Sequence, residues 1–317
     1  MEITVALAPI GRINFNMELA EELRVKFRRT LIYGGARVIG GENFITDLES
    51  AQDYVDMVKK QSFDVLVAFY GTFADSKMIS LIAEQVDKPI FLWAVPEKPN
   101  GDRLELNSLC GVNLAAHSLR LKKIPYGYAY ADANDMKLVS KILILGAAGK
   151  IVEKLSRTKI GIWGEYPAGM DSCILDKSTL DEKLGVEICE YPLDEMFARI
   201  RSIDKTAVAP VQIRLQNQVD GIDQLDQNQV AGTLSSYLVM KELVKTDRLD
   251  GLAIRCWPEF FENLKCSACA AISMMTNEMV STSCEADING TITDLMLQWA
   301  SGGTSFSADM VVFDAET

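Results

Sequence analysis

Two acidic side chains late in the sequence, Glu285 and Asp309, are of the type that binds a divalent cation. Glu285 lies in the acidic run 284–290, which leads into an amphipathic segment, and Asp309 follows a short apolar stretch. A strand-end acid, a helix and a second strand-end acid can place two carboxylates at one edge of an open α/β sheet, where such folds bind ligands. Two carboxylates at one point repel each other unless a proton or a cation lies between them. The pattern therefore predicts a site for Mg²⁺ or Mn²⁺, which prefer oxygen ligands.

The segment between the two acids has the spacing of a buried helix face. Its apolar residues recur at i, i+3, i+4 and i+7, at positions Ile292, Leu295, Met296 and Trp299. The glycine pair at 302–303 is expected to end this helix. Spacing alone favours a simpler explanation, in which one acid caps the helix and the other lies exposed at a strand end.

The other residues that could take part in catalysis or binding give a less specific functional signal. Glu259 follows Trp257 and Pro258 after an apolar strand, which suits either a ligand contact or a helix cap. Cys266 and Cys269 form the single CxxC of the chain, and without a second such pair we expect two buried helix cysteines and no structural zinc. His117, the single histidine, has no serine or cysteine partner identifiable in the sequence, which disfavours acyl-transfer hydrolysis.

The elements that must position these residues follow a regular alternation. Short apolar runs at 4–10, 65–70, 89–95, 159–163 and 251–256 predict buried strands, and amphipathic stretches between them predict helices. This alternation predicts the α/β class, with two doubly wound parallel-sheet domains of the Rossmann or flavodoxin-like type in tandem.

The predicted domains have definite bounds. We expect an N-terminal domain at 1–157 and a second domain, carrying the acidic site, at 158–303. Residues 304–317 are expected to begin a further, C-terminal domain with an emerging strand. The stretch 212–226, rich in glutamine and aspartate, is expected to be irregular.

The composition and charge of the chain exclude several classes of partner and location. The net charge is −12, from 32 basic and 44 acidic side chains, with no isolated basic cluster, so nucleic acid is not an expected partner. No apolar run is long enough to span a bilayer, and the first residues lack the basic region of a signal peptide. We therefore expect a cytoplasmic protein whose seven cysteines are free thiols.

Three segments together resemble the L-fucose isomerase-like family of sugar isomerases. They are 106–111 (LNSLCG), 254–260 (IRCWPEF) and 284–290 (CEADING) leading to Asp309. The resemblance implies a metal-dependent ketol isomerase acting through an enediol, in which Glu285 and Asp309 bind Mn²⁺ (or Mg²⁺) and transfer the proton. It also implies sugar-binding roles near the strand-end loops, for which the candidates are Arg12, Trp257, Glu259 and Asn289.

The sequence departs from that family in one respect. Members carry a third metal ligand, a histidine in a C-terminal domain, whereas no histidine follows His117 here. The resemblance therefore implies a chain that lacks most of that domain and has weak activity alone. Three interpretations stay open: an isomerase of the fucose type, an isomerase of another aldose such as arabinose, and a non-catalytic sugar-binding or assembly module. The family also implies a homo-oligomer.

Overall fold

The chain folds as two compact units, Met1–Lys150 and Ile151–Thr317. The structure is a computed structural model that describes residues 1–98, 101, 103–309, 312 and 314. The division falls within helix α5 (Met136–Leu155), a few residues before the predicted domain boundary. No helix in these ranges is both long and apolar enough to cross a membrane.

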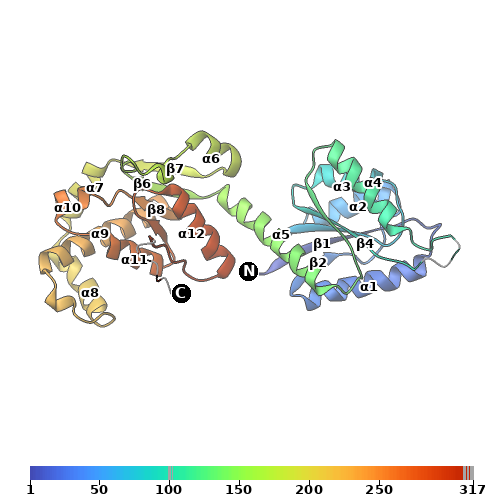
Figure 1. The fold of residues 1–317 in the computed structure, drawn as a ribbon, viewed down its shortest axis with the longest axis horizontal. Coiled ribbons are helices and arrows are strands. Elements are labelled where there is room, and N and C mark those ends of the chain that lie inside the picture. The colour runs from blue at the N-terminus through green and yellow to red at the C-terminus, as the bar shows by residue number, and fades with distance from the viewer. Residues whose placement is uncertain (99–100, 102, 310–311, 313, 315–317) are drawn as a thin grey trace. The chain divides into compact units, whose positions relative to one another are not determined.

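Unit 1 contains a five-stranded parallel sheet in the order β2-β1-β3-β4-β5 (Figure 1). Every residue of β1 and β3 is buried, because helices cover both faces of the sheet. This double burial explains why these strands are continuous apolar runs with no polar alternation. The strands are β1 (Ile3–Ile10), β2 (Ala36–Gly40), β3 (Val65–Tyr70), β4 (Ile90–Ala94) and β5 (Tyr126–Tyr130).

The helices of unit 1 divide between the two faces of its sheet. Helices α1 (Met17–Tyr33) and α5 pack on one face, where Phe27 of α1 stacks on Phe69 with ring centroids 4.9 Å apart. Helices α2 (Leu48–Val58), α3 (Lys77–Gln85) and α4 (Ser108–Leu121) pack on the other face. The result is a doubly wound α/β unit with two apolar layers.

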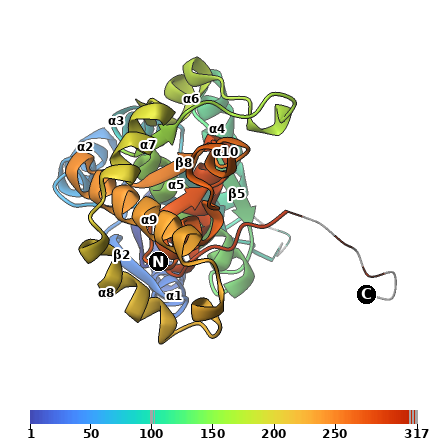
Figure 2. The same ribbon diagram turned by 90° about the vertical axis from the view of Figure 1, so that its left-hand side faces the viewer.

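Unit 2 repeats this plan with a four-stranded parallel sheet in the order β7-β6-β8-β9. Helices α6 (Lys177–Leu184) and α12 (Ile288–Ser301) pack on one face, and α7 (Leu193–Ser202), α9 (Gln227–Asp247) and α11 (Cys269–Asn277) on the other. Figure 2 shows α6, α7 and α9. The strands are β6 (Lys159–Trp163), β7 (Glu187–Tyr191), β8 (Gly251–Ile254) and β9 (Ser281–Ser283).

The predicted fold class is confirmed, since both sheets are parallel and interleaved with helices. Some local expectations are wrong. The stretch 212–226 was expected to be irregular, but 212–216 are the end of helix α8 (Lys205–Gln216) and Ile222–Gln224 form a 3₁₀ turn, because Leu215 and Ile222 pack against an apolar cluster around Leu234. The remaining residues of this stretch are irregular, as expected. Residues 304–309 form no strand, and 310–311, 313 and 315–317 lie outside the described residues.

The two CxxC cysteines also differ from expectation. Cys266 is buried but precedes α11, and Cys269 is the exposed first residue of that helix. All seven cysteines are free thiols, as expected.

Helix α12 is attached to the sheet by a buried hydroxyl as well as by apolar contacts. Thr291 Oγ1 donates to the carbonyl oxygen of Leu252 in β8 at 2.9 Å and lies 2.7 Å from Ser283 Oγ in β9. Because Thr291 is fully buried, these polar groups have no water to replace a lost partner. The hydroxyl therefore sets where α12 begins relative to the ends of both strands.

Replacement of this hydroxyl should destabilise the protein. We expect Thr291→Val to lower the free energy of unfolding by about 1–3 kcal/mol, because it leaves buried polar groups unpaired. Thr293→Val is the matched control, since Thr293 is exposed on the same helix and donates only to a carbonyl one turn earlier. Denaturant unfolding of both variants measures the difference, and an equal small loss in the two would contradict the assigned role.

Candidate active site

The carboxyl edge of the unit 2 sheet gathers most of the residues singled out in the sequence. The strand order reverses between β6 and β8, and open α/β sheets bind ligands at such a switch point. Three segments leave this edge, at 164–169 after β6, at 255–259 after β8 and at 284–287 after β9. Glu285, Trp257 and Glu259 lie on these segments.

Glu285 lies in a tight turn between β9 and α12. Glu285 and Ala286 have left-handed backbone conformations, with φ of 58° and 53°, which costs roughly 1–2 kcal/mol for each non-glycine residue. The turn is held by the Ala286 amide, which donates to the carbonyl oxygen of Ile254 in β8 at 2.9 Å. Asp287 then caps α12 by accepting from the Gly290 amide at 2.9 Å. The predicted acidic turn leading into a helix is therefore present.

The carboxylates at this turn repel one another. Partial burial, followed by the negative charges of Asp309 and Asp287, raises the pKa of Glu285. The same acids also affect Cys173. Burial is the main cause of its raised pKa, and the negative charges of Asp287, Glu285 and Asp309 raise the pKa further. Glu285 and Asp309 thus share one electrostatic environment, in which a cation or a proton would relieve the repulsion.

Two thiols lie beside this turn. A hydrogen bond from Cys284 lowers the pKa of Cys256 to about 7, although burial opposes the shift. The pKa of Cys284 is raised by the same contact and by burial. Cys256 follows β8 and Cys284 follows the neighbouring strand β9, so the strand ends bring the pair together.

The segment that carries Asp309 is tied to α12 by a side chain that sequence reasoning missed. Asp294 is only 4% exposed, and both of its carboxylate oxygens lie within 2.9 Å of the Ser307 hydroxyl, which donates to it. The available signal was the polar spacing of α12, where Thr291, Asp294 and Gln298 recur beside the apolar face. Gln298 likewise donates to the carbonyl oxygen of Met279 at 2.7 Å.

The apolar face predicted for this helix is only partly correct. Ile292 and Leu295 are buried as expected. Met296 is exposed, and Trp299 is half-buried with the Lys154 ammonium 4.9 Å from its ring centroid. The helix also buries three polar residues beside the predicted stripe, Thr291, Asp294 and Gln298, because the strand ends and the 304–309 segment offer hydrogen-bonding groups there.

Glu259 is held by an arginine that the sequence did not single out. Arg255 binds both carboxylate oxygens of Glu259, through Nε at 2.7 Å and Nη2 at 2.6 Å. Its Nη1 donates to the carbonyl oxygen of Glu165 at 2.8 Å, so the same guanidinium joins the loops after β6 and β8. Glu259 therefore positions this edge through Arg255, while the Trp257 side chain is 53% exposed beside it.

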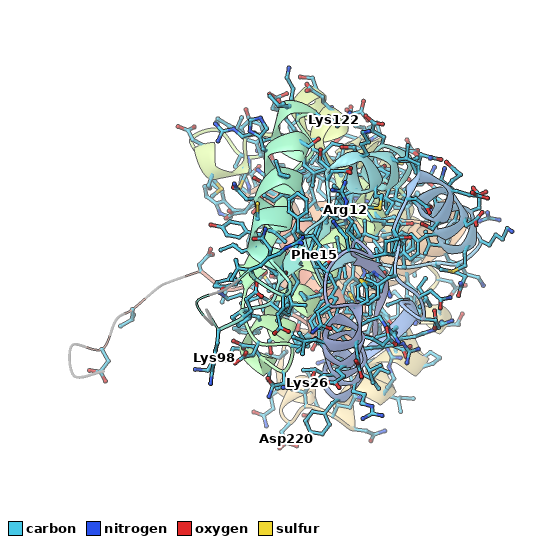
Figure 3. All side chains as sticks on the ribbon, turned by 90° about the vertical axis from the view of Figure 1, so that its right-hand side faces the viewer. Arg12, Phe15, Lys26, Lys98, Lys122 and Asp220 are labelled. Carbon is cyan, nitrogen blue, oxygen red and sulfur yellow. The ribbon has the colours of Figure 1, made fainter. Side chains whose placement is uncertain are left out.

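The remaining candidates, Asn289 and Arg12, lie in different units. Asn289 Nδ2 donates to the carbonyl oxygen of Ile174 at 3.2 Å, which joins the start of α12 to the loop before α6. Arg12 belongs to unit 1, at the carboxyl end of β1, and pairs with Asp75 at 2.5 Å. Its guanidinium lies 5.5 Å from the ring centroid of Phe73, close to Phe15 (Figure 3).

The acidic residues at this edge provide some, but not all, of the ligands that a hard cation needs. Glu285 and Asp309 offer carboxylate oxygens, the ligands that Mn²⁺ and Mg²⁺ prefer. Within the described ranges no group of three or more His, Cys, Asp or Glu side chains is arranged to hold a metal ion. His117 lies on α4 in unit 1. The two acids can therefore supply part of a metal site.

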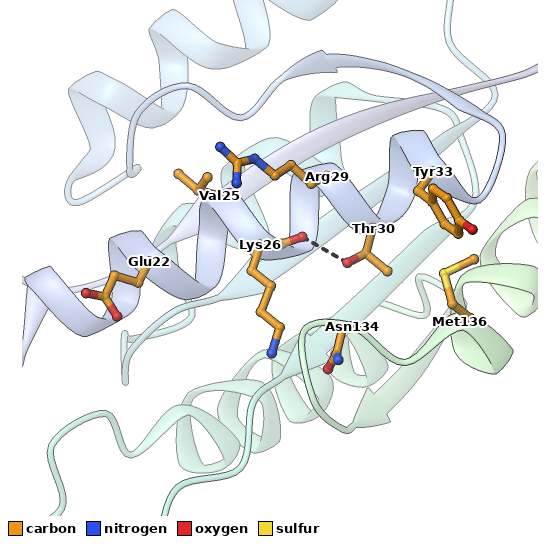
Figure 4. Close-up of a pocket in the computed structure, with 8 residues that line it drawn as sticks. All are labelled: Glu22, Val25, Lys26, Arg29, Thr30, Tyr33, Asn134 and Met136. Carbon is orange, nitrogen blue, oxygen red and sulfur yellow. Dashed lines mark hydrogen bonds between the residues drawn. The ribbon is translucent and has the colours of Figure 1, made fainter.

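A separate pocket of about 380 Å³ lies in unit 1, along the outer side of α1 (Figure 4). Its charged lining residues are Glu22, Lys26 and Arg29, and Asn134 and Met136 close its other side. None of the candidate site residues lines it, so this pocket gives no support to a sugar site.

Comparison with known proteins decides the family. Residues 6–155 match the family described as fucose/sulfoquinovose isomerase, N-terminal domain. The sulfoquinovose isomerase of Priestia aryabhattai is 31% identical over 316 residues, which are 99% of this chain and 70% of that protein. The chain belongs to the fucose/sulfoquinovose isomerase family. The sulfoquinovose isomerase of Alkalicoccus urumqiensis is 28% identical over 315 residues, with the same coverage of both chains.

Family membership confirms the resemblance and the enzyme class. The protein is a sugar isomerase of the aldose–ketose type, of the fucose isomerase family. The matched region includes unit 2, so the acidic turn lies within the part of the chain shared with these relatives.

Neutralising Glu285 should stabilise the metal-free protein. Because its pKa is raised on folding, the ionised carboxylate opposes folding above that pKa, and the opposition disappears below the ordinary glutamate pKa of about 4.3. We expect Glu285→Gln to melt at a higher temperature than the unmodified protein at pH 7 in chelator, and the gain to vanish near pH 4.

The matched control for this experiment is Glu262→Gln, because Glu262 is an exposed acid on the short helix α10 (Glu259–Leu264) after β8. It should leave the melting temperature unchanged at both pH values. A Glu285→Gln protein that melts at or below the unmodified temperature at pH 7 would contradict the repulsion among these carboxylates.

Proposed function

We propose that this isomerase converts sulfoquinovose, a sulfonated aldohexose, into the corresponding ketose. The supporting observation is 31% identity to a sulfoquinovose isomerase across 99% of this chain, including the acidic turn of unit 2. The family also includes fucose isomerases, so L-fucose is the competing substrate. D-arabinose, or binding without turnover, are the further alternatives.

The proposed chemistry moves a proton from C2 to C1 of the open-chain sugar through an enediol. Glu285 is the proposed base, because partial burial and the neighbouring acids raise its pKa towards the working pH, where proton transfer is efficient. Asp309 is the proposed partner, which shares the electrostatic environment of Glu285. The left-handed turn fixes the Glu285 backbone at the strand end, where the proposed base is needed.

We propose that Glu285 and Asp309 also hold Mn²⁺, or Mg²⁺ in its place. When bound, the metal would supply Lewis-acid stabilisation of negative charge on the enediol oxygens. The mutual repulsion of the acids supports this assignment, because a cation between them removes it.

Sugar contacts are proposed for the remaining exposed candidates. The exposed ring of Trp257 offers an apolar face to the sugar, and the Asn289 amide lies at the start of α12. Arg12, at a strand end of unit 1, remains a prediction as a sugar-binding residue; its guanidinium is of the kind that binds a sulfonate, and it pairs with Asp75. Glu259 is proposed to act indirectly, through its bidentate pair with Arg255.

Substrate preference tests this function. With Mn²⁺ supplied, we expect kcat/KM for sulfoquinovose to exceed that for L-fucose and D-arabinose at least about tenfold, because a charged group held by the site discriminates strongly. A coupled assay that detects the ketose measures all three.

Glu285→Gln should lower kcat by about 100-fold or more, with Glu262→Gln as the active control. A preference for L-fucose would contradict the sulfonate assignment, and binding without turnover would contradict catalysis by this chain.

The pH dependence tests the role of Glu285. A base must be ionised, so activity should fall as the pH drops through the raised pKa of Glu285. Asp287→Asn removes one of the charges that raise this pKa, while asparagine remains a good helix cap. We therefore expect the acid limb of the kcat/KM profile to move to lower pH in this variant. An unchanged acid limb would mean that another group controls it.

A further inference from the structure

Strand β5 is an open edge of the unit 1 sheet. It is the last strand in the order β2-β1-β3-β4-β5 and pairs with β4 on one side (Figure 2). Within the described ranges no strand pairs with its other side. Tyr128 is 67% exposed and Tyr130 is 49% exposed, so residues of this edge strand are accessible to solvent. An edge of this kind is a template for another strand.

The register shows which backbone groups face outward. The Ala131 amide donates to the carbonyl oxygen of Ala94 in β4 at 3.0 Å, just past the pair Ala94 and Tyr130. Backbone groups alternate sides along a strand, so Ala129 and Gly127 also face β4. The N–H and C=O groups of Tyr126, Tyr128 and Tyr130 therefore face the open edge.

A second copy of the same strand complements this edge. In an antiparallel pair centred on Tyr128, that residue lies opposite its own copy, and Tyr126 lies opposite Tyr130 of the second copy. Each opposed pair exchanges two backbone hydrogen bonds, about six in all. The side chains of these alternate residues lie on one face of the sheet, so the same pairing aligns tyrosine rings across the junction, where aromatic pairs are favourable.

The charges that flank β5 are also self-complementary. Lys123 precedes the strand and Asp132 follows it, whereas the neighbouring Lys122 pairs with Glu84 and Asp135 accepts from the Lys137 and Leu138 amides at the start of α5. Antiparallel pairing places the basic end of one strand against the acidic end of the other, at both ends of the junction. Parallel pairing would place like charges together. The strand itself, YGYAY, contains no charged residue of the kind that protects open edges from pairing.

We propose that two copies of this chain associate through β5, as antiparallel edge strands related by a two-fold axis. The two five-stranded sheets then form one continuous sheet, and the interface is closed because each copy presents the same surface. This association does not depend on the proposed substrate or metal.

Disruption of the strand pairing is the first test. Sedimentation velocity of the full chain should show a dimer, or an assembly built from dimers, and Tyr128→Lys should raise the dissociation constant at least about tenfold by placing like charges opposite each other. Tyr33→Lys is the matched control, because Tyr33 is an 85% exposed tyrosine on α1 of the same unit. Circular dichroism establishes that both variants are folded.

A charge exchange gives the sharper test. Lys123→Glu and Asp132→Lys should each weaken association, and the double variant should restore it, because the exchange recreates opposite charges across the junction. Within one chain these residues lie at opposite ends of the strand, roughly 25–30 Å apart, so an interaction within one copy cannot explain the rescue.

Hydrogen exchange gives an independent measurement. The amides of Tyr126, Tyr128 and Tyr130 should become protected as the protein concentration rises, while exposed amides elsewhere do not change. A monomeric protein at tens of micromolar, or an assembly that tolerates Tyr128→Lys and both single charge variants, would overturn the proposal.

Discussion

The repulsion among carboxylates at the carboxyl end of β9 is the constraint that organises unit 2. Partial burial and the charges of Asp309 and Asp287 oppose ionisation of Glu285, yet the turn holds it there in a left-handed backbone conformation. Such an arrangement persists only where surrounding contacts over-determine it. The amide of Ala286, bonded to β8, and the Asp287 cap on α12 supply those contacts.

Helix α12 links the strained turn to the rest of the unit. Its apolar residues pack on β6 and β8, while Thr291, Asp294 and Gln298 bind polar groups of the strand ends and of the 304–309 segment. One helix therefore determines the position of the turn at its start and anchors the chain that leads to Asp309. Because the same helix holds both segments, a loss of its packing would disturb the surroundings of Glu285 and of the segment that carries Asp309.

The two units repeat one strand order, and each has a switch point with its own ion pair. In unit 2 the pair is Arg255 with Glu259, and in unit 1 it is Arg12 with Asp75. Both pairs involve an arginine that follows a central strand. In both units an ion pair lies where parallel strands end, which is the edge at which open α/β sheets bind ligands.

Local patterns in the sequence were sufficient for the fold class and for the acidic turn. Continuous apolar runs identify strands buried on both faces, and the run 284–290 identifies a strand end, a cap and a helix start, because these depend on neighbouring residues. The sequence predicted Glu285 and Asp309 at one edge by way of a strand leading to Asp309, but 304–309 form no strand, and the link between the two acids is the charge of Asp309 that raises the pKa of Glu285.

Only the tertiary structure determined the contacts between distant residues. The bond of Asp294 to Ser307, the pairing of Cys256 with Cys284 and the inward turn of Thr291 depend on which segments meet at the end of a sheet. The irregular path of 304–309 and the exposed Met296 have the same origin. The periodicity of a sequence predicts which apolar side chains are buried. Whether a polar side chain is buried depends on the hydrogen-bonding group that folding places opposite it.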